Sequence, residues 1–491
     1  MFSGFSRRHF AKLTGLSAFF GLAATPAKPA DGDARPAAER HAPFPFPNDF
    51  VWGTATSSYQ IEGAVNEDGR GRSIWDTFAH TPGKIEDGSN ADRANDHYHR
   101  YKEDVGLIRD LGVKAYRFSI AWPRVFPEGS GAANPKGLDF YNRLVDELLN
   151  NGIEPYATLY HWDLPQALQD RVGGWQSSDT SKAFGDYAGY VAERLSDRVK
   201  NIFTLNEAGR FLNFGYGWGI DAPGLKLPLA ELNQARHNVV LAHGLAVQAI
   251  RAKARAGTKV GPAENIAACV PAFDTPEHVR AAEMATRELN AGFLGVILEG
   301  KYTDGFLEYN GKDAPKFTAD ELKIIGAKND FVGLNIYAPQ FYIAASDNKP
   351  GWSVLPFPAS FPHMNSEWLK IGPEVIYWAP RLAAKVWNID TIYISENGTS
   401  SEDKLRDDGQ VYDLDRISYL RNYLAQLQRA TAEGVPVKGY FLWSLMDNFE
   451  WIFGFEKRFG VYRVDFETQA RVPKLSASFF RDVVARNAIG V

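Results

Sequence analysis

Two glutamates that lie far apart in the sequence each stand where an apolar, strand-like run ends. Glu207 closes the segment TLNE at residues 204–207, and Glu396 lies within the segment YISENG at residues 393–398. Two facing carboxyl groups can cleave a glycosidic bond with retention, because one attacks the anomeric carbon while the other, kept protonated, donates its proton to the leaving oxygen. Either motif alone is also compatible with a solvated turn, since Glu-Asn-Gly after an apolar run is a turn signal. The elements around the two glutamates therefore decide between these interpretations.

Short β-rich runs alternate with longer helical segments from residue 46 onward, which is the pattern of parallel strands joined by crossover helices. The predicted strands lie near residues 50–55, 113–120, 154–160, 200–206, 258–264, 330–336, 391–396 and 438–444. The predicted helices span residues 96–111, 136–151, 179–197, 230–256, 275–290, 373–387, 413–433 and 473–488. Eight such repeats predict an α/β protein, a single closed (β/α)8 TIM barrel with elaborated loops at the C-terminal face. An open doubly wound sheet is the alternative, but the nearest match to its glycine-rich phosphate loop, GYGWGI at 215–220, has Ile220 where the third glycine belongs.

Catalytic groups of such a barrel project from the C-terminal ends of the strands. The side chains that fall there are His161 after the third strand, Asn206 and Glu207 at the fourth, Asn335 and Tyr337 at the sixth, Glu396 at the seventh and Trp443 at the eighth. Arg117 lies within the second strand. The barrel is therefore expected to bring both glutamates to one rim.

The composition describes an ordinary globular chain. Of its 491 residues, 45% are hydrophobic and 23% are charged, which allows a large core. The formal net charge is -5, and no block of like charges occurs. This argues against a nucleic-acid partner, whose phosphates need a basic face. We expect a small, uncharged substrate, and no pattern in the sequence defines an oligomeric state.

The N-terminal residues differ from the rest of the chain. Residues 6–12, SRRHFAK, lead into a modest apolar stretch at 13–24, and an Ala/Pro-rich segment follows to about residue 43. This pattern predicts a twin-arginine export signal over residues 1–30 without a defined cleavage point, a linker over 31–43 and one catalytic barrel over 44–491. A disordered basic tail is the alternative. The apolar stretch is too short for a stable membrane span, so we expect a periplasmic or secreted protein.

No metal or other cofactor is expected. The sequence has no HExxH motif, and His97 and His99 stand two positions apart on a predicted helix, where they cannot share one face. We interpret both histidines as solvated surface residues. Cys269 is the only cysteine, so no internal disulfide can form, and its apolar neighbours predict a buried small hydrophobe and not a nucleophile.

With these motifs in order, the chain resembles glycoside hydrolase family 1, the retaining β-glucosidases, β-galactosidases and their relatives, from about residue 44 to the C-terminus. The resemblance rests on the two glutamate motifs and on SYQIEG at 58–63, YRFSIAWPR at 116–124, YHWDLP at 160–165 and WSLMDNFEW at 443–451. It implies that Glu396 is the nucleophile and Glu207 the acid/base. Glu396 must stay ionised, and Arg117 is the natural cationic partner. Glu207 must hold a proton near neutral pH, which burial or a like-charged neighbour can bring about.

The resemblance also implies which residues hold the sugar. The expected substrate-contacting residues are Gln60, His161, Trp162, Asn206, Asn335, Tyr337, Trp368, Trp443, Glu450 and Trp451. Trp443 and Trp451 would offer apolar surface to the C–H face of the ring, and Trp368 resembles the family's aglycone-side platform. A carboxylate at Glu450 favours a free sugar hydroxyl and disfavours the phosphate of a 6-phosphosugar.

One position departs from the family pattern. The family usually has proline directly after the acid/base glutamate, whereas this chain has Ala208. Because proline restricts the preceding residue to extended geometry, we expect Glu207 to be less constrained here. The aglycone side, including residues 345–370, is where specificity should differ.

The leading hypothesis is a retaining, exo-acting β-glycosidase, foremost a β-glucosidase, that hydrolyses unphosphorylated β-glucosides or β-galactosides, including oligosaccharides. A transglycosylase working through the same glycosyl-enzyme is one alternative. A non-catalytic sugar-binding protein on the same scaffold is the other, since a fold does not guarantee its chemistry.

Overall fold

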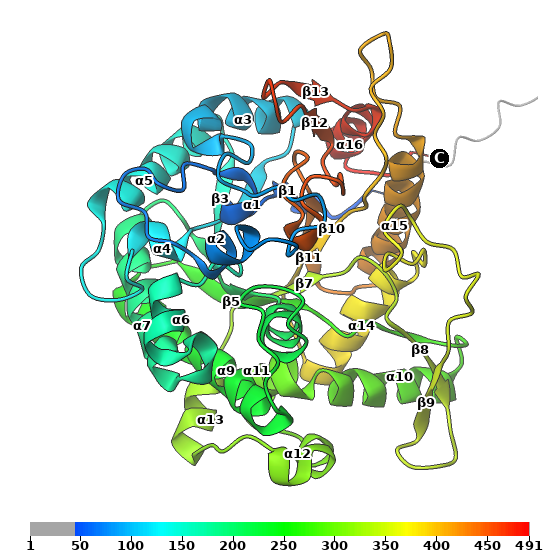
Figure 1. Cartoon of the computed structure of the whole chain (residues 1–491). Helices are drawn as coiled ribbons and strands as arrows, with labels where there is room; N and C mark the ends of the chain where they lie inside the picture. The colour runs from blue at the N-terminus through cyan, green and yellow to red at the C-terminus, as the bar shows by residue number, and fades with distance from the viewer. Residues whose placement is uncertain (1–44, 491) are drawn as a thin grey trace, which may run out of the picture. The chain divides into compact units, whose positions relative to one another are not determined.

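A closed barrel of parallel strands forms the centre of the protein (Figure 1). The computed structural model describes residues 45–490, so the predicted export signal and linker lie outside the described residues. The barrel strands are β1 (Val51–Ala55), β2 (Ala115–Ser119), β3 (Glu154–Tyr160), β4 (Asn201–Asn206), β5 (Lys259–Asn265), β7 (Val332–Asn335), β10 (Ile392–Asn397) and β11 (Val437–Trp443). Pairing of β1 with both β2 and β11 closes the barrel. This confirms the predicted (β/α)8 TIM barrel, with every strand within a few residues of its expected place.

Within residues 45–490, eight long helices surround the strands, one after each barrel strand along the chain (Figure 1). They are α3 (His97–Leu111), α5 (Pro135–Asn150), α7 (Ser178–Leu195), α9 (Leu229–Lys253), α10 (Pro276–Leu289), α14 (Val375–Trp387), α15 (Leu414–Ala432) and α16 (Leu475–Arg486). Most bury one apolar stripe, as α5 does with Leu138, Leu144 and Leu148. The helical periodicity in the sequence located all eight.

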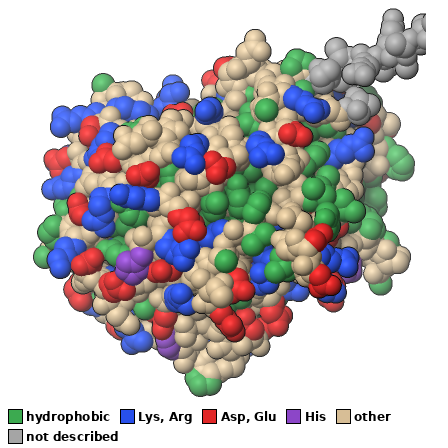
Figure 2. Space-filling model, turned by 90° about the horizontal axis from the view of Figure 1, so that it is seen from above, with side chains coloured by type: hydrophobic (Ala, Val, Ile, Leu, Met, Phe, Trp, Pro, Cys, Tyr) green, Lys and Arg blue, Asp and Glu red, His purple; other side chains and the backbone are tan. Residues whose placement is uncertain are grey.

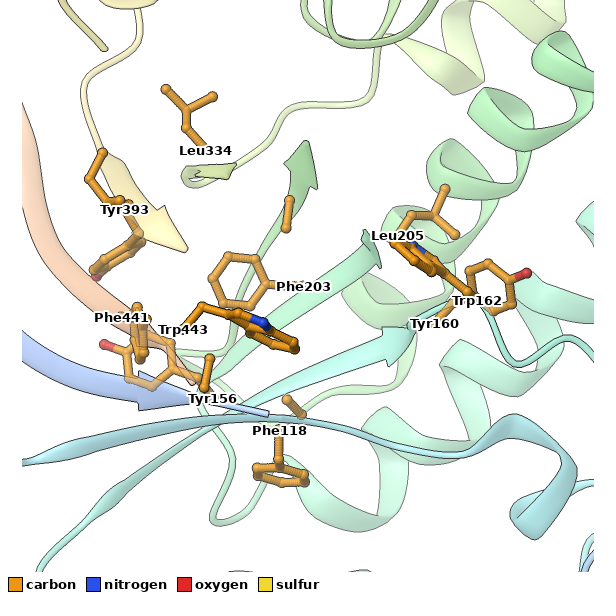
Figure 3. Packing of buried hydrophobic residues seen from close by; sticks show 14 of the residues in the cluster. Phe118, Tyr156, Tyr160, Trp162, Phe203, Leu205, Leu334, Tyr393, Phe441 and Trp443 are labelled. Atoms are coloured by element: carbon orange, nitrogen blue, oxygen red, sulfur yellow. The ribbon is translucent and has the colours of Figure 1, made fainter. Parts of the chain in front are cut away.

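Aromatic side chains fill the interior of the barrel (Figure 3). The ring of Tyr156 on β3 packs against that of Phe441 on β11 with centroids 4.9 Å apart. Phe203 on β4 packs at the same distance on Phe331. Gly53 is required by this packing, because a Cβ at that position would lie 2.4 Å from the Phe441 ring. Such a close-packed interior gives the strand ends a rigid support.

Shorter helices and strands lie in the segments that connect the barrel strands and the long helices. The short α-helices are α1 (Ser58–Ile61), α2 (Ile74–Ala79), α4 (Trp122–Val125), α6 (Gln166–Val172), α8 (Ala208–Phe211), α11 (Val296–Glu299), α12 (Asp304–Asn310) and α13 (Ala319–Ile325). The 3-10 helices are η1 (Gly174–Gln176), η4 (Gly311–Asp313) and η5 (Trp451–Phe453), and the π-helices are η2 (Leu212–Gly217) and η3 (Ala291–Gly295). Two small sheets complete the fold: β6 (Cys269–Pro271) with β8 (Phe341–Ala345) and β9 (Trp352–Leu355), and the hairpin of β12 (Tyr462–Val464) with β13 (Arg471–Pro473).

The interpretation of His97 as a solvated residue is wrong. Its side chain is buried, and Nδ1 lies 2.8 Å from Asp104 on the same helix. Arg471 on β13 donates to the same carboxylate at 2.9 Å, so the C-terminal hairpin covers this part of α3. His99 is exposed, as expected, and Cys269 is buried, as expected.

The charged side chains on the surface are mixed in sign, as the sequence, which has no block of like charges, leads us to expect. On the face shown in Figure 2, basic and acidic side chains are interspersed, without a continuous patch of one sign. Within residues 45–490, no helix combines the length and the apolarity needed to cross a bilayer. Among these described residues, no three or more His, Cys, Asp or Glu side chains are grouped so that they could hold a metal ion.

Candidate active site

A cavity of about 420 Å³ opens at the C-terminal ends of the strands. The sequence-predicted residues that line it are His161, Trp162, Glu207, Tyr337, Trp368, Glu396, Trp443, Glu450 and Trp451. The remaining four predicted residues, Gln60, Arg117, Asn206 and Asn335, are buried and hydrogen-bond to side chains of the lining. Residues separated by nearly 400 positions thus meet in one site.

Glu396 accepts a hydrogen bond on each of its carboxylate oxygens. Arg117 Nη1 donates to Oε1 at 2.7 Å, and the hydroxyl of Tyr337 donates to Oε2 at 2.7 Å. Both the glutamate and the arginine are buried, with 3% and 1% of their surface exposed. The carboxylate of Glu396 is thus held on one oxygen by a guanidinium and on the other by a hydroxyl.

Arg117 is itself held from three sides. Its Nε donates to Thr158 at 3.1 Å, and its Nη2 donates to Asn206 Oδ1 at 2.6 Å. The guanidinium also lies 4.9 Å from the centre of the Phe203 ring. The barrel interior therefore fixes the cation that faces Glu396.

Glu207 stands in a different electrostatic environment. Burial, and next the charge of Glu396, raise the pKa of Glu207 from its ordinary 4.5 to about 7. Asn335 Nδ2 donates to its Oε1 at 2.8 Å, and this bond lowers the pKa, as the charges of Arg210 and Arg117 also do. Below neutral pH the cavity thus holds one carboxyl group that mostly retains its proton and another that is paired with a cation.

The backbone of Glu207 is not extended, contrary to the geometry assumed from the family's proline. Its φ is 52° and its ψ is 58°, in the left-handed region that costs energy for a residue other than glycine. It forms the N-cap of α8, and its N–H donates to Ala263 O on β5 at 2.8 Å. Ala208 also keeps a backbone N–H that proline would lack.

His161 is neutral, and its hydrogen bonds define which nitrogen carries the proton. Burial, and next the charge of Arg117, lower the pKa of His161 well below its ordinary value. Asn206 accepts from Arg117 through Oδ1, so its Nδ2 is the donor to His161 Nε2 at 3.2 Å. The proton of the neutral ring is therefore on Nδ1, which remains available as a donor.

Glu450 and Gln60 form a polar pair at another side of the cavity. Gln60 Nε2 lies 3.4 Å from Glu450 Oε2, and it also donates to Asn448 and to the carbonyl of Phe449. Burial raises the pKa of Glu450 to about 8. Glu450, which lines the cavity, can therefore donate a hydrogen bond when protonated and accept one in either form, as sugar hydroxyls require.

Aromatic rings frame the rest of the cavity. Trp451 packs on Trp162 with centroids 4.4 Å apart, and Trp443 stacks on His161 at 5.7 Å. Trp162 is fixed by a hydrogen bond from its indole N–H to Asn206 O at 2.9 Å. Trp368 is different, because 46% of its surface is exposed. It therefore lies at the rim of the cavity, whereas the other three rings form its interior.

Sequence reasoning missed seven lining residues: Arg210, Phe214, Asn265, Gln340, Ile452, Phe453 and Phe459. Arg210 and Phe214 lie on α8 and η2, which are too short to produce a helical period in the sequence. The Arg210 guanidinium lies 3.3 Å from the centre of the Phe214 ring and 3.3 Å from Asp221. Asn265 ends β5, so the rule that strand ends carry functional groups could have identified it.

Comparisons with known proteins show which sequences and structures this chain is similar to. The chain matches the model of glycosyl hydrolase family 1 over residues 42–489. It is 44% identical over 448 residues to "Beta-glucosidase A" of Acetivibrio thermocellus, covering 90% of this chain and 98% of the relative. It is 43% identical over 445 residues to "Beta-glucosidase A" of Thermotoga maritima, with coverage of 90% and 98%. A solved structure of the Thermotoga maritima β-glucosidase with glucoimidazole superposes with a TM-score of 0.82 at 42% identity, covering 91% of this chain and 100% of that one.

Proposed function

The chain belongs to glycosyl hydrolase family 1 and is a glycoside hydrolase, and we propose that it is a retaining, exo-acting β-glucosidase acting on unphosphorylated β-glucosides and β-galactosides. The observation that carries the proposal is the contrast between two carboxyl groups in one cavity. Glu396 accepts from Arg117 and Tyr337, whereas burial and Glu396 raise the pKa of Glu207 to about 7. A nucleophile and a proton donor need this difference in charge.

In the first half-reaction, the Glu396 carboxylate attacks the anomeric carbon as the bond to the leaving oxygen breaks. Glu207 gives its proton to that oxygen, and the aglycone departs as an alcohol. Arg117 and Tyr337 orient the attacking carboxylate by holding both of its oxygens. The product is a glycosyl ester on Glu396.

In the second half-reaction, water attacks the same carbon and the ester bond to Glu396 breaks. Esterification removes the charge of Glu396, which is one of the causes of the high pKa of Glu207. Glu207 is then more readily ionised, so it can accept the proton of the attacking water. One pair of residues thereby serves both steps.

The polar lining supports a monosaccharide unit as the group that is held. His161 Nδ1 and Glu450 offer hydrogen-bonding groups, and Trp443 and Trp451 offer apolar surface. A carboxyl group at Glu450 would repel a 6-phosphate once it is ionised, so unphosphorylated glycosides fit better. The named relatives are β-glucosidases, which favours glucose as the sugar.

The test is turnover of a panel of aryl β-glycosides by the full chain and by Glu396→Ala. We expect hydrolysis of the β-glucoside by the unmodified protein and none by the variant, with β-glucose as the first anomer seen by NMR. Glu402→Ala is the matched control, since Glu402 is an exposed glutamate six positions downstream that pairs with Lys404. Near-normal turnover by Glu396→Ala, or α-glucose as the first product, would exclude the mechanism. Sugar binding without any turnover would indicate the non-catalytic alternative.

Transglycosylation is the second candidate, and the exposed Trp368 favours it. A ring at the rim can hold an acceptor sugar where the aglycone has left. Product analysis with added alcohols or sugars separates the two outcomes. Transfer products that exceed hydrolysis at moderate acceptor concentration would favour the transferase.

The proposal includes export by the twin-arginine route to the periplasm or beyond. The support is the sequence SRRHFAK at residues 6–12 and the apolar stretch that follows it. Residues 1–43 fused to a folded fluorescent protein should deliver it outside the cytoplasm, and replacement of both Arg7 and Arg8 by lysine should retain it. Equal export of both fusions would contradict the proposed route.

A further inference from the structure

Glu264 is a buried carboxyl group directly behind the proposed acid/base, and the mechanism above gives it no role. It lies on β5 with 3% of its surface exposed. Along a strand, successive side chains point to opposite faces. Its neighbour Asn265 lines the cavity, so Glu264 points the other way, toward the first turn of α8. Its Oε1 accepts a hydrogen bond from the backbone N–H of Ala208 at 2.9 Å.

Strand β5 therefore holds the backbone of Glu207 on both sides. The N–H of Glu207 donates to Ala263 O, and the next N–H along the chain, that of Ala208, donates to Glu264. These bonds fix the peptide planes before and after a residue whose φ of 52° is unfavourable for glutamate.

We propose that Glu264 is a positioning residue for Glu207, acting through the backbone amide of Ala208. This inference rests on the proposed function, because it assigns a role relative to the acid/base. The direction in which the Glu207 side chain leaves the backbone depends on the turn that Glu264 stabilises. A carboxyl group that must reach the leaving oxygen loses efficiency when it is displaced by a fraction of an ångström to an ångström.

Alanine in place of the family's proline at residue 208 supplies the N–H that bonds to Glu264. Proline has no N–H, so a proline at this position could not donate to Glu264. Ala208 is completely buried, and without Glu264 its N–H would be left without this partner away from water. The pair of Ala208 and Glu264 is thus a matched donor and acceptor.

The protonation of Glu264 suits this role. Burial, and more weakly the charge of Glu207, raise the pKa of Glu264 to about 8, although the hydrogen bond from the Ala208 amide lowers it. Near neutral pH the group is mostly uncharged, so it adds no third negative charge near Glu207, yet its carbonyl oxygen still accepts. The other elements packed against β5 here carry Arg210 on α8, and Arg236 and His243 on α9. These three pair with Asp221, Asn213 and Thr204 respectively.

The first test compares Glu264→Ala with Glu264→Gln. We expect Glu264→Ala to lower kcat/KM about tenfold for cellobiose, whose leaving group needs an acid, and to spare a dinitrophenyl β-glucoside, whose leaving group does not. Glu264→Gln keeps an acceptor oxygen and should recover most of the loss. Glu154→Ala is the matched control, since Glu154 also bonds across to the next strand, through Asn201, but stands at the opposite end of the barrel.

The second test is a double-mutant cycle with Ala208→Pro, which removes the donor. If the hydrogen bond is shared, Ala208→Pro should lower the cellobiose rate in the unmodified background and add little in the Glu264→Ala background. This variant also serves if Glu264→Ala does not fold. Equal losses on both substrates, no recovery in Glu264→Gln, or full additivity in the cycle would overturn the positioning role. An unmodified protein without glycosidase activity would overturn the proposed function, and this inference with it.

Discussion

Removal of the Glu207 carboxyl group should affect substrates in proportion to how much their leaving group needs a proton. The rise in the pKa of Glu207 from its ordinary 4.5 to about 7 is worth about 3 kcal/mol of proton affinity. At pH 6 such a group is protonated in about nine of ten molecules, whereas an ordinary glutamic acid would be protonated in about one of thirty. The cavity thus keeps the acid form available where the reaction needs it.

For Glu207→Ala we expect a loss of about 10²- to 10⁴-fold in kcat/KM for cellobiose, the usual worth of general acid catalysis. A dinitrophenyl β-glucoside should be nearly spared in the glycosylation step, because its leaving group departs without a proton. Hydrolysis of the glycosyl-enzyme should be slow in this variant, because no base activates the water. Added azide needs no base, so it should restore turnover and give a glycosyl azide. The alkaline fall of kcat/KM near pH 7 in the unmodified protein should disappear in the variant.

The assay is steady-state kinetics of both substrates from pH 5 to 9, with and without azide. Equal losses on the two substrates would refute the reasoning, because they would show a general disturbance of the site. Persistence of the alkaline limb in Glu207→Ala would assign that titration to another group, such as Glu450 or Glu264.

Three further predictions concern single contacts. Tyr337→Phe removes the hydrogen bond to a carboxylate oxygen of Glu396. We expect kcat to fall about 10- to 100-fold while the melting temperature changes little. An unchanged kcat would contradict the role of Tyr337 in orienting the nucleophile. Trp368→Ala removes the exposed ring at the rim of the cavity. It should raise KM for cellobiose about 3- to 10-fold and leave KM for methyl β-glucoside unchanged. Equal increases in KM for both substrates would argue against an aglycone platform. Lys474→Met removes one of the two cations that pair with each of the buried Asp403 and Asp447, which keep Arg416 and Arg458 respectively. It should lower the free energy of unfolding by about 3 kcal/mol in a denaturant titration, whereas a loss below about 1 kcal/mol would show that the network is dispensable.

The barrel could be predicted from the sequence because its signals are local. Each strand is a short apolar run followed by an amphipathic helix, and each functional residue at a strand end inherits its place from that strand. Asn206 and Glu207 are placed by β4 in this way, and Tyr337 follows β7. The short helices and the small β6–β8–β9 sheet were missed, because three to seven residues give no measurable period.

Interactions between distant segments could not be predicted. The buried His97 shares Asp104 with Arg471, which lies on a hairpin more than 360 positions downstream. Glu264 lies within an apolar run, GPAEN, where nothing local indicates that its partner is the amide of Ala208. The left-handed backbone of Glu207 could not be predicted either, because the amides of Glu207 and Ala208 bond to Ala263 and Glu264 on β5, which lie far along the chain.

The central claim, that Glu396 becomes covalently glycosylated, is tested most directly by trapping. A 2-deoxy-2-fluoro β-glucoside with a dinitrophenyl leaving group should react once, because the fluorine slows both half-reactions and the leaving group restores only the first. Mass spectrometry of a protease digest should then find the fluoroglucosyl group on the peptide that contains Glu396. A label on any other peptide, or no label in a protein that still hydrolyses β-glucosides, would contradict the mechanism.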